Sequence, residues 1–183
     1  MIEAIITDFD GTLVDTYQAN YLAYEKAFVE LGLELTSAQY KECYGLRFTE
    51  FMQSMGIEDL TTVAKIKALK KDYYPLFFKY LKPNTALIEL IRSYQNSGRK
   101  TAIASTASKA NLMNAIEHLN LSNIFDLVYT ATDVVHAKPS PEIYEKTMCV
   151  LAVRPEETLI FEDSQVGLAA AKSSGAHVLQ ITL

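Results

Sequence analysis

Buried-strand patterns and helical patterns alternate from residue 84 onward, and this alternation constrains the fold more than any other feature of the sequence. Short apolar runs are bounded by turn residues, and the segments between them carry apolar residues at helical spacing. A further apolar run, around Ile5 and Ile6, is expected to be a buried strand near the start of the chain. Strands that alternate with helices pair in parallel and are covered on both faces, so we predict an α/β fold with a doubly wound, mostly parallel, Rossmann-like sheet. The expected strands are 101–105, 127–129, 158–161 and 177–182, and the expected helices are 84–98, 108–119, 140–151 and 165–174.

Residues 15–82 interrupt this alternation with consecutive helical patterns and no convincing strand. This indicates an inserted all-helical unit, whose aromatic stripes are more typical of a packed core than of a cofactor site. Pro75 lies inside the last pattern and is expected to kink it. We therefore predict an α/β core formed by 1–14 and 83–183, with a helical cap formed by 15–82. The helical patterns are 17–31, 36–44, 48–55 and 61–80.

The composition excludes several classes of partner. The chain of 183 residues has a formal net charge of −5, and its longest run of basic residues is the pair Lys70–Lys71, so it has no basic footprint for nucleic acid. Cys43 and Cys149 lack metal-type spacing and indicate free thiols of a reducing compartment. No apolar run approaches the length of a membrane span, and no basic leader is present. We expect a cytoplasmic protein that binds neither nucleic acid nor membrane.

Polar residues follow four of the predicted strands, where a parallel sheet binds its ligands. Taken singly, each has a structural explanation, such as a serine that caps a helix, a lysine in a solvated loop or an acidic N-cap. A calcium loop of the helix-loop-helix kind is disfavoured, because the required acidic spacing and closing glutamate are missing. Their joint occurrence at successive strand ends predicts one pocket. The residues are Asp8, Asp10, Ser105, Thr106, Lys138, Glu162 and Asp163.

This set of residues suits phosphoryl transfer through an aspartyl intermediate. An aspartate with its ordinary pKa of about 3.9 is ionised at neutral pH, so the nucleophile needs no activating base. Two unit charges 4 Å apart repel by about 4 kcal/mol at an effective dielectric constant of 20, so attack on a phosphate needs added positive charge. Lys138 and Mg²⁺ would supply it, with the metal held by oxygen ligands. Asp10 would move the proton, which requires a pKa near neutrality.

Four motifs, in the expected order and spanning nearly the whole chain, resemble the haloacid dehalogenase (HAD) superfamily of phosphohydrolases, in the branch with a helical cap. They are DFDGTLVD from Asp8, ASTASK around Ser105, the pair Lys138-Pro139, and FEDSQVGLAAAKSSGA from Phe161. The resemblance disfavours carbon-halogen hydrolysis, because the dehalogenases of the superfamily lack the acid/base aspartate and the metal. It implies Asp8 as nucleophile, Asp10 as acid/base, Ser105, Thr106 and Lys138 as phosphate holders, and a magnesium site of Asp8, Glu162, Asp163 and the main-chain carbonyl of Asp10.

Within the superfamily the chain is similar to the beta-phosphoglucomutase and sugar-phosphatase group. The mutases carry a histidine, at the position of Asn20, that is thought to orient Asp10 toward a sugar hydroxyl. Because an amide cannot do acid/base chemistry, we expect a Mg²⁺-dependent phosphatase of a small phosphorylated metabolite. A mutase, and more remotely a non-catalytic phosphometabolite-binding protein, stay open as alternatives. Asn20, Arg47 and Lys71 are candidate substrate contacts, with a solvated surface position as the alternative for the two basic residues.

Overall fold

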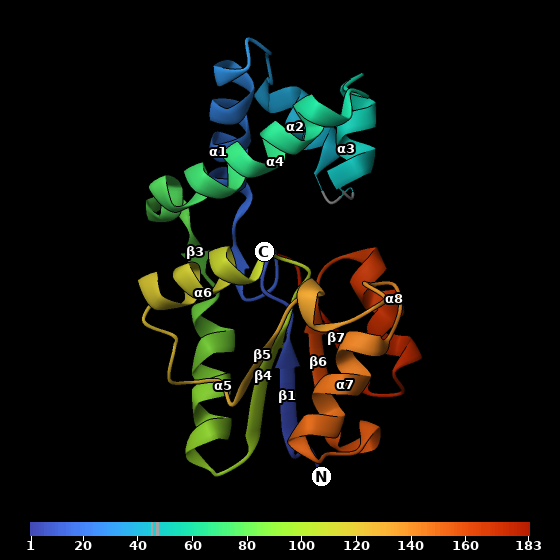
Figure 1. The fold of residues 1–183 in the computed structure, drawn as a ribbon. Coiled ribbons are helices and arrows are strands. Elements are labelled where there is room, and N and C mark those ends of the chain that lie inside the picture. The colour runs from blue at the N-terminus through green and yellow to red at the C-terminus, as the bar shows by residue number, and fades with distance from the viewer. Residues whose placement is uncertain (45, 47) are drawn as a thin grey trace. The chain divides into compact units, whose positions relative to one another are not determined.

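The computed structural model describes residues 1–44, 46 and 48–183, which form two compact units. Residues 1–15 and 82–183 form the core unit, and residues 16–81 form the helical unit (Figure 1). The division made from the sequence differs from these boundaries by one residue at each junction. Each unit has a hydrophobic core of its own, so the two are described separately.

The core unit is built on a five-stranded, all-parallel sheet with the strand order β5-β4-β1-β6-β7. Its central strand, β1, is buried along its whole length. Ile6 of β1 lies opposite Ala102 of β4 on one side and opposite Ile160 of β6 on the other. The strands are β1 (Ala4–Thr7), β4 (Lys100–Ala104), β5 (Leu127–Tyr129), β6 (Thr158–Glu162) and β7 (His177–Gln180).

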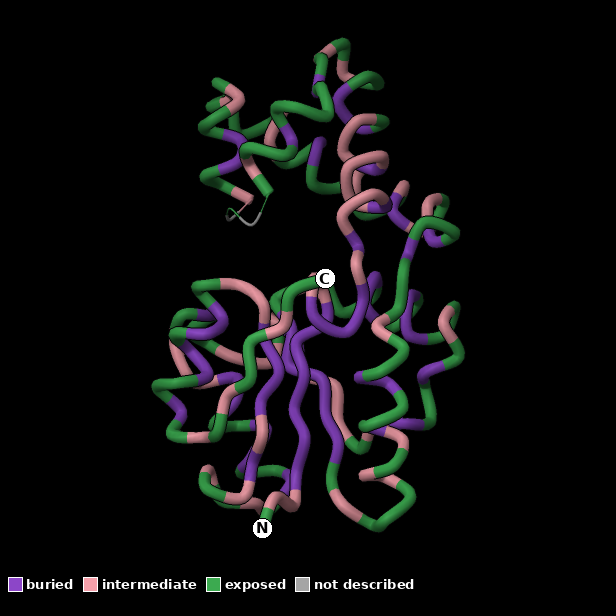
Figure 2. The backbone as a smooth tube through the Cα atoms, turned by 180° about the vertical axis from the view of Figure 1, so that it is seen from behind, coloured by how far each residue is buried: buried purple, intermediate pink, exposed green. Residues whose placement is uncertain are grey.

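Helices cover both faces of this sheet, α5 and α6 on one face and α7 and α8 on the other (Figure 1). The change of face follows from the right-handed crossover rule, because the chain moves outward from β1 to β5 and then crosses to the opposite side of β1. The three central strands β4, β1 and β6 are largely buried, whereas the edge strand β5 is half-buried and the edge strand β7 is mostly exposed (Figure 2). The helices are α5 (Thr85–Asn96), α6 (Lys109–His118), α7 (Glu142–Leu151) and α8 (Gln165–Ser173).

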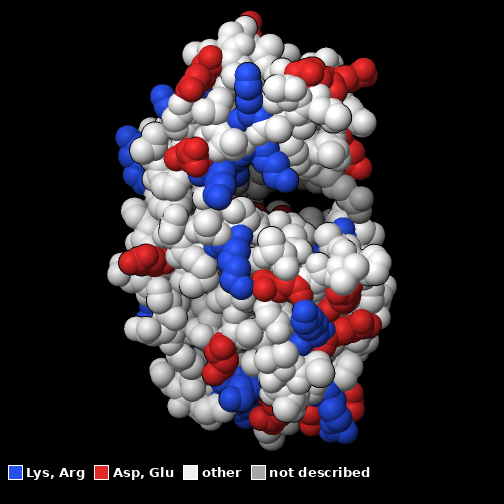
Figure 3. All heavy atoms as spheres, in the orientation of Figure 1, with Lys and Arg blue, Asp and Glu red and all other residues white. Residues whose placement is uncertain are grey.

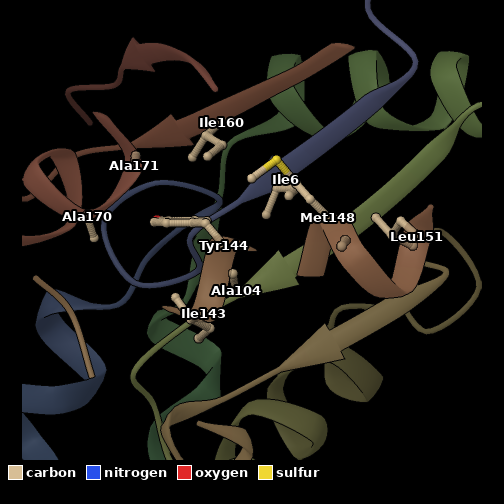
Figure 4. Packing of buried hydrophobic residues seen from close by; sticks show 10 residues of the cluster. Ile6, Ala104, Ile143, Tyr144, Met148, Leu151, Ile160, Ala170 and Ala171 are labelled. Carbon is tan, nitrogen blue, oxygen red and sulfur yellow. The ribbon is translucent and has the colours of Figure 1, made fainter. Parts of the chain in front are cut away.

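One hydrophobic cluster joins the sheet to α7 and α8 (Figure 4). Ile6 and Ile160 contribute from the strands, and Tyr144 and Met148 contribute from α7. Ile6 and Tyr144 are fully buried, so shortening either side chain leaves a cavity. An isoleucine of this kind stabilises a fold by about 2–5 kcal/mol relative to alanine. The cluster therefore sets the position of α7 on the sheet.

A short antiparallel pair, β2 (Val14–Asp15) with β3 (Lys82–Pro83), stands where the chain leaves and re-enters the core unit. The sequence did not predict it, because two residues are too few to show a strand period. Next to it, the main-chain amide of Asn84 donates to the carbonyl of Leu13 at 2.8 Å, and the Asn84 side chain donates to the carbonyl of Thr12 at 3.3 Å. These bonds attach the loop after β1 to the start of α5.

The helical unit begins and ends its helices largely where the sequence predicts. Thr36 and Gln39 form the expected capping box, with the Gln39 amide donating to Thr36 Oγ1 at 3.2 Å. The pattern over 61–80 contains two elements, because the α-helix stops just before Pro75 and continues as a 3-10 segment. Phe28, Phe51 and Ile66 are buried in its core. The elements are α1 (Tyr17–Glu30), α2 (Ser37–Cys43), α3 (Phe48–Ser54), α4 (Leu60–Tyr73) and η1 (Tyr74–Tyr80).

The hydropathy of the helices and the charge on one face can be described directly. None of the described helices is both long and apolar enough to cross a lipid bilayer. On the face of the core unit seen in Figure 3, acidic and basic side chains are interspersed. This face therefore lacks the continuous basic surface that binds a nucleic-acid backbone.

Candidate active site

The carboxyl ends of three neighbouring strands bring the predicted site residues to one edge of the sheet. Asp8 directly follows β1, Ser105 directly follows β4, and Glu162 is the last residue of β6. Asp163 comes next in the chain. Lys138 arrives from the connection between β5 and α7. The parallel order of the sheet thus gathers residues that are far apart in the sequence.

Lys138 bridges two carboxylates. Its Nζ donates to Asp8 Oδ1 at 2.7 Å and to Glu162 Oε1 at 2.6 Å. The three side chains are 4%, 9% and 1% exposed, respectively. A hydrogen bond with a charged donor such as the lysine ammonium group is stronger than a neutral one, and burial strengthens it further. Lys138 is therefore a fixed part of the site, which rules out the alternative of a solvated loop lysine.

The loop that carries Lys138 is held by Glu142 in the first turn of α7. The Glu142 carboxylate accepts hydrogen bonds from the main-chain amides of Val135 at 2.7 Å and His136 at 2.8 Å. These two N–H groups hold the pKa of Glu142 below its ordinary value. The ionised carboxylate thus fixes the backbone shortly before Lys138.

Glu162 is engaged through both of its oxygens. Oε1 accepts hydrogen bonds from Lys138 and, at 3.2 Å, from the hydroxyl of Tyr144. Oε2 accepts from the main-chain amide of Ser164 at 2.9 Å and from its hydroxyl at 3.1 Å. The predicted role of Glu162 as a metal ligand stays a prediction, and the structure gives its carboxylate a different set of partners.

Asp163 lies against the turn that follows β1. Its Oδ1 accepts a hydrogen bond from Thr12 Oγ1 at 2.8 Å. Gly11 has a φ of +84°, and a Cβ at this position would lie 2.3 Å from Asp163 Oδ2. Only glycine combines this backbone conformation with the space for the carboxylate. The glycine of the first motif therefore allows an acidic residue of the fourth motif to approach β1.

Asp10 occupies a more open position than Asp8. It forms an isolated β-bridge with Val14 in the tight turn after β1, where the Gly11 amide donates to the Val14 carbonyl at 2.8 Å. Its side chain is half-buried, whereas Asp8 is buried. Its charge also contributes to the electrostatic environment of Asp8, so the two carboxyl groups are close. Their different exposure favours different chemical roles.

Ser105 is buried at the end of β4, and Thr106 is exposed. The Ser105 hydroxyl accepts a hydrogen bond from the main-chain amide of Ala107 at 3.1 Å. The residue at the N-cap of α6 is Ser108, so Ser105 is not the helix cap that the sequence left as an alternative. The strand end therefore places a hydroxyl inside the protein, with Thr106 outside.

The electrostatics of the site favour added positive charge. Burial raises the pKa of Asp8 from 3.8 to about 8, although the charge of Lys138 acts in the opposite direction. Burial also raises the pKa of Asp163. Burial alone would lower the pKa of Lys138, but the neighbouring charges, that of Asp8 foremost, raise it overall. The expectation that Asp8 has an ordinary pKa is thus wrong for the metal-free protein, because the side chain is desolvated.

The donor atoms of the site fit a hard divalent cation. Asp8 and Asp163 offer carboxylate oxygens, and the missing side chain of Gly11 creates the cradle that admits Asp163. Among residues 1–44, 46 and 48–183, no three His, Cys, Asp or Glu side chains form a ready cluster for a metal. A site made of two carboxylates and the main-chain carbonyl of Asp10 does not require such a cluster.

The predicted substrate contacts in the helical unit have different surroundings. Asn20 donates through Nδ2 to Thr16 Oγ1 at 3.0 Å, which fixes its amide within the same unit. Lys71 is exposed, whereas Lys70 is half-buried with its Nζ 5.2 Å from the ring centroid of Tyr24. Arg47 lies outside the described residues. The roles of these residues stay predictions.

Three residues of the site were not identified from the sequence: Thr12, Tyr144 and Gly167. Thr12 belongs to the first motif, but nothing in the sequence shows that it contacts Asp163. Tyr144 lies on the apolar face expected for a buried helix. The helical spacing therefore predicts that its ring packs in the core, but it gives no sign that the hydroxyl forms a hydrogen bond in the site. A glycine inside a helical pattern was the one available signal for Gly167, because alanine is preferred there unless space is needed.

Three comparisons with known proteins agree with this arrangement. A family model described as haloacid dehalogenase-like hydrolase matches residues 5–181. The chain is 30% identical over 178 residues to a phosphorylated carbohydrates phosphatase of Thermotoga maritima. The aligned region covers 95% of this chain and 82% of that protein.

Two solved structures of CbbY from Rhodobacter sphaeroides are also similar. The complex with phosphate has a TM-score of 0.86 at 28% identity and covers 100% of this chain and 87% of that one. A variant in complex with xylulose-1,5-bisphosphate has a TM-score of 0.85 at 27% identity, with the same coverage.

Proposed function

The chain belongs to the haloacid dehalogenase-like hydrolase family, and from this we propose that it is a Mg²⁺-dependent phosphatase. The proposed substrate is a small phosphorylated carbohydrate, and the proposed intermediate is an aspartyl phosphate on Asp8. The observation that carries the proposal is the buried contact of 2.7 Å between Lys138 and Asp8. In a protein that only binds phosphate, a carboxylate beside the lysine would weaken binding, because the carboxylate and the phosphate are both negatively charged and repel each other. A carboxylate that attacks the phosphorus atom, in contrast, must lie next to the lysine that holds the phosphoryl group.

The proposed reaction has two steps. Asp8 attacks the phosphorus atom while the bond between phosphorus and the sugar oxygen breaks, and Asp10 gives its proton to the departing oxygen. Asp10 then takes a proton from a water molecule, which attacks the phosphorus of the aspartyl phosphate and releases inorganic phosphate. Lys138 and Ser105 hold phosphoryl oxygens during both steps. The half-buried position of Asp10 supports its part, because both the departing sugar oxygen and a water molecule must reach it.

The metal would be held by Asp8, Asp163 and the main-chain carbonyl of Asp10. When bound, Mg²⁺ would offset the negative charge of the carboxylates and of the phosphoryl group. Thr12 and Gly11 act before any metal arrives, because they orient and admit the Asp163 carboxylate. Glu162 is left out of this set, since Lys138, Tyr144 and Ser164 already engage its oxygens.

The substrate class rests on relatives and on the helical unit. One relative is named a phosphorylated carbohydrates phosphatase, and a similar structure holds a sugar bisphosphate. We propose that unit 16–81 is the helical cap and that it selects the substrate. Hydrolysis is favoured over a mutase reaction because Asn20 carries an amide, which neither gives nor takes a proton at neutral pH.

Phosphate release from a panel of sugar phosphates, phosphoglycolate and nucleotides tests the proposal. Wild-type protein with Mg²⁺ should release phosphate from one or more sugar phosphates, and EDTA should abolish the release. Asp8→Asn should lose turnover while keeping its fold. Glu117→Gln, which removes an exposed carboxylate on α6, is the matched control and should keep full activity.

Two results would refute the proposal. Substantial activity of Asp8→Asn would remove Asp8 as nucleophile, and full activity in EDTA would remove the metal. Transfer of phosphate between sugar positions that exceeds phosphate release would instead identify a mutase.

A further inference from the structure

Tyr144 belongs to the hydrophobic core through its ring and to the polar site through its hydroxyl. Its ring belongs to the hydrophobic cluster between the sheet and α7, with Ile6, Met148 and Ile160 among its members (Figure 4). It is fully buried, yet its hydroxyl donates to Glu162 Oε1 at 3.2 Å. Packing alone would be served equally well by phenylalanine. The hydroxyl therefore calls for an explanation in the polar site.

Glu162 is also constrained by Gly167. A Cβ on Gly167 would lie 1.8 Å from Glu162 Oε1 and 2.4 Å from Oε2. Gly167 lies in the first turn of α8, where glycine is less favourable than alanine. The missing side chain therefore has a local cost and leaves the space that the Glu162 carboxylate fills.

We propose that the Tyr144 hydroxyl and the missing side chain of Gly167 are positioning elements that hold Lys138 against Asp8 through Glu162. The inference rests on the proposed function, in which Lys138 holds the phosphoryl group. Neither residue is proposed to contact substrate.

The physical reason lies in how Glu162 shares its charge. Lys138 and Tyr144 donate to the same oxygen, Oε1. Without the hydroxyl, that oxygen is neutralised by Lys138 alone, so the ammonium group is drawn toward Glu162 and away from Asp8. With the hydroxyl present, Glu162 holds the lysine less tightly. An ammonium group has three N–H donors, so it can then contact Asp8 and a phosphoryl oxygen while still held.

Gly167 affects Lys138 indirectly, through the position of the Glu162 carboxylate. The carboxylate can accept from both donors of Ser164 only if it lies over the first turn of α8. A methyl group at position 167 would push it out of this place, and Lys138 would follow it. The series Gly167, Glu162, Lys138 and Asp8 thus links the start of α8 to the nucleophile through direct contacts.

Tyr144→Phe isolates the hydroxyl. It keeps the ring in the core and keeps an aromatic face 5.0 Å from Lys138 Nζ. We expect kcat to fall about tenfold, as for a lost hydrogen bond to a charged group, with less than about threefold change in KM. Tyr94→Phe, which removes a hydroxyl from α5 outside the site, is the control and should leave kcat unchanged.

The effect must depend on Glu162. In a Glu162→Gln background, itself expected to lose more than tenfold in kcat, adding Tyr144→Phe should change kcat by less than about twofold. A purely structural role of Tyr144 predicts the same loss in both backgrounds. Equal losses, or full activity of Tyr144→Phe, would overturn the inference for Tyr144.

Gly167→Ala gives a second, independent measurement. Helix propensity alone predicts a higher melting temperature, whereas the contact with Glu162 predicts a lower one together with at least tenfold lower kcat. In a Glu162→Ala background, where the carboxylate is absent, the same substitution should raise the melting temperature. A rise in both backgrounds would overturn the role of Gly167.

Crystal structures separate this inference from the proposed function. If the wild-type protein releases no phosphate from any substrate of the panel, the proposed function fails. The distance from Lys138 Nζ to Asp8 Oδ1, 2.7 Å in the wild type, then decides the positioning role. It should lengthen in Tyr144→Phe and in Gly167→Ala, and an unchanged distance in both would refute the inference.

Discussion

Replacing the proposed nucleophile by asparagine should make the metal-free protein more stable. In the unfolded chain Asp8 titrates near its ordinary pKa of 3.8, whereas burial raises the pKa to about 8 in the fold. The folded protein must therefore take up a proton at Asp8, or bury its charge, at any pH above about 4. Asparagine carries no charge in either state, so this cost disappears in Asp8→Asn.

The magnitude follows from the pKa shift. At pH 7 the unfolded chain lies about three pH units above its pKa, and each unit corresponds to about 1.4 kcal/mol, so the gain is about 4 kcal/mol. At pH 5 the same reasoning gives about 2 kcal/mol, and below pH 3.8 the gain vanishes. The free energy by which Asp8 destabilises the fold thus increases as the pH rises from the unfolded pKa toward the folded one. A gain of 4 kcal/mol corresponds to roughly 8–16 °C in melting temperature for a chain of this size.

Thermal unfolding in EDTA between pH 5 and pH 8 measures this effect. Asp8→Asn should melt above the wild type, by a margin that narrows toward pH 5, while the surface control Glu117→Gln should stay within about 0.5 kcal/mol of the wild type. Adding Mg²⁺ should stabilise the wild type more than the variant, because a cation compensates the charge that asparagine lacks. The reasoning is refuted if Asp8→Asn melts below the wild type at pH 7, or if the margin does not change with pH.

Two further substitutions test the surroundings of the nucleophile. Gly11→Ala places a Cβ 2.3 Å from Asp163 Oδ2 at a φ of +84°, so we expect a lower melting temperature and at least tenfold weaker activation by Mg²⁺; an unchanged Mg²⁺ titration would contradict the assignment of Asp163. Asn20→His should not raise the rate of phosphate release, because hydrolysis does not need the histidine of the mutases. A large gain in that assay would show that Asn20 limits the wild-type reaction.

The sequence predicted the order and type of the main elements because each carries a local signal. Asn84 caps α5 as expected, with its Oδ1 accepting from the Leu87 amide at 3.2 Å. The helix interruption at Pro75 and the parallel order of the sheet likewise follow from covalent geometry and hydrophobic period. The pair β2 and β3 was not predicted because these strands of two residues form only by pairing with each other, although they lie far apart in the sequence.

The partners within the site could not be predicted in the same way. Sequence position places Lys138 in a loop, but its burial arises from two carboxylates supplied by β1 and β6. The sequence also predicts Glu162 as a metal ligand, which stays a prediction. Its actual partners depend on where α7 presents Tyr144, which is a tertiary contact without a local signal. The shifted pKa of Asp8 has the same origin, since burial is a property of the folded protein.

The central claim is that Asp8 forms a covalent bond to the phosphoryl group. Acid-quenched turnover with a sugar phosphate that the enzyme hydrolyses, followed by peptide mass spectrometry, tests it most directly. We expect one phosphoryl group on the peptide that contains Asp8 in the wild type and none in Asp8→Asn. Phosphate release by the wild type without any phosphoryl group on that peptide would contradict the account.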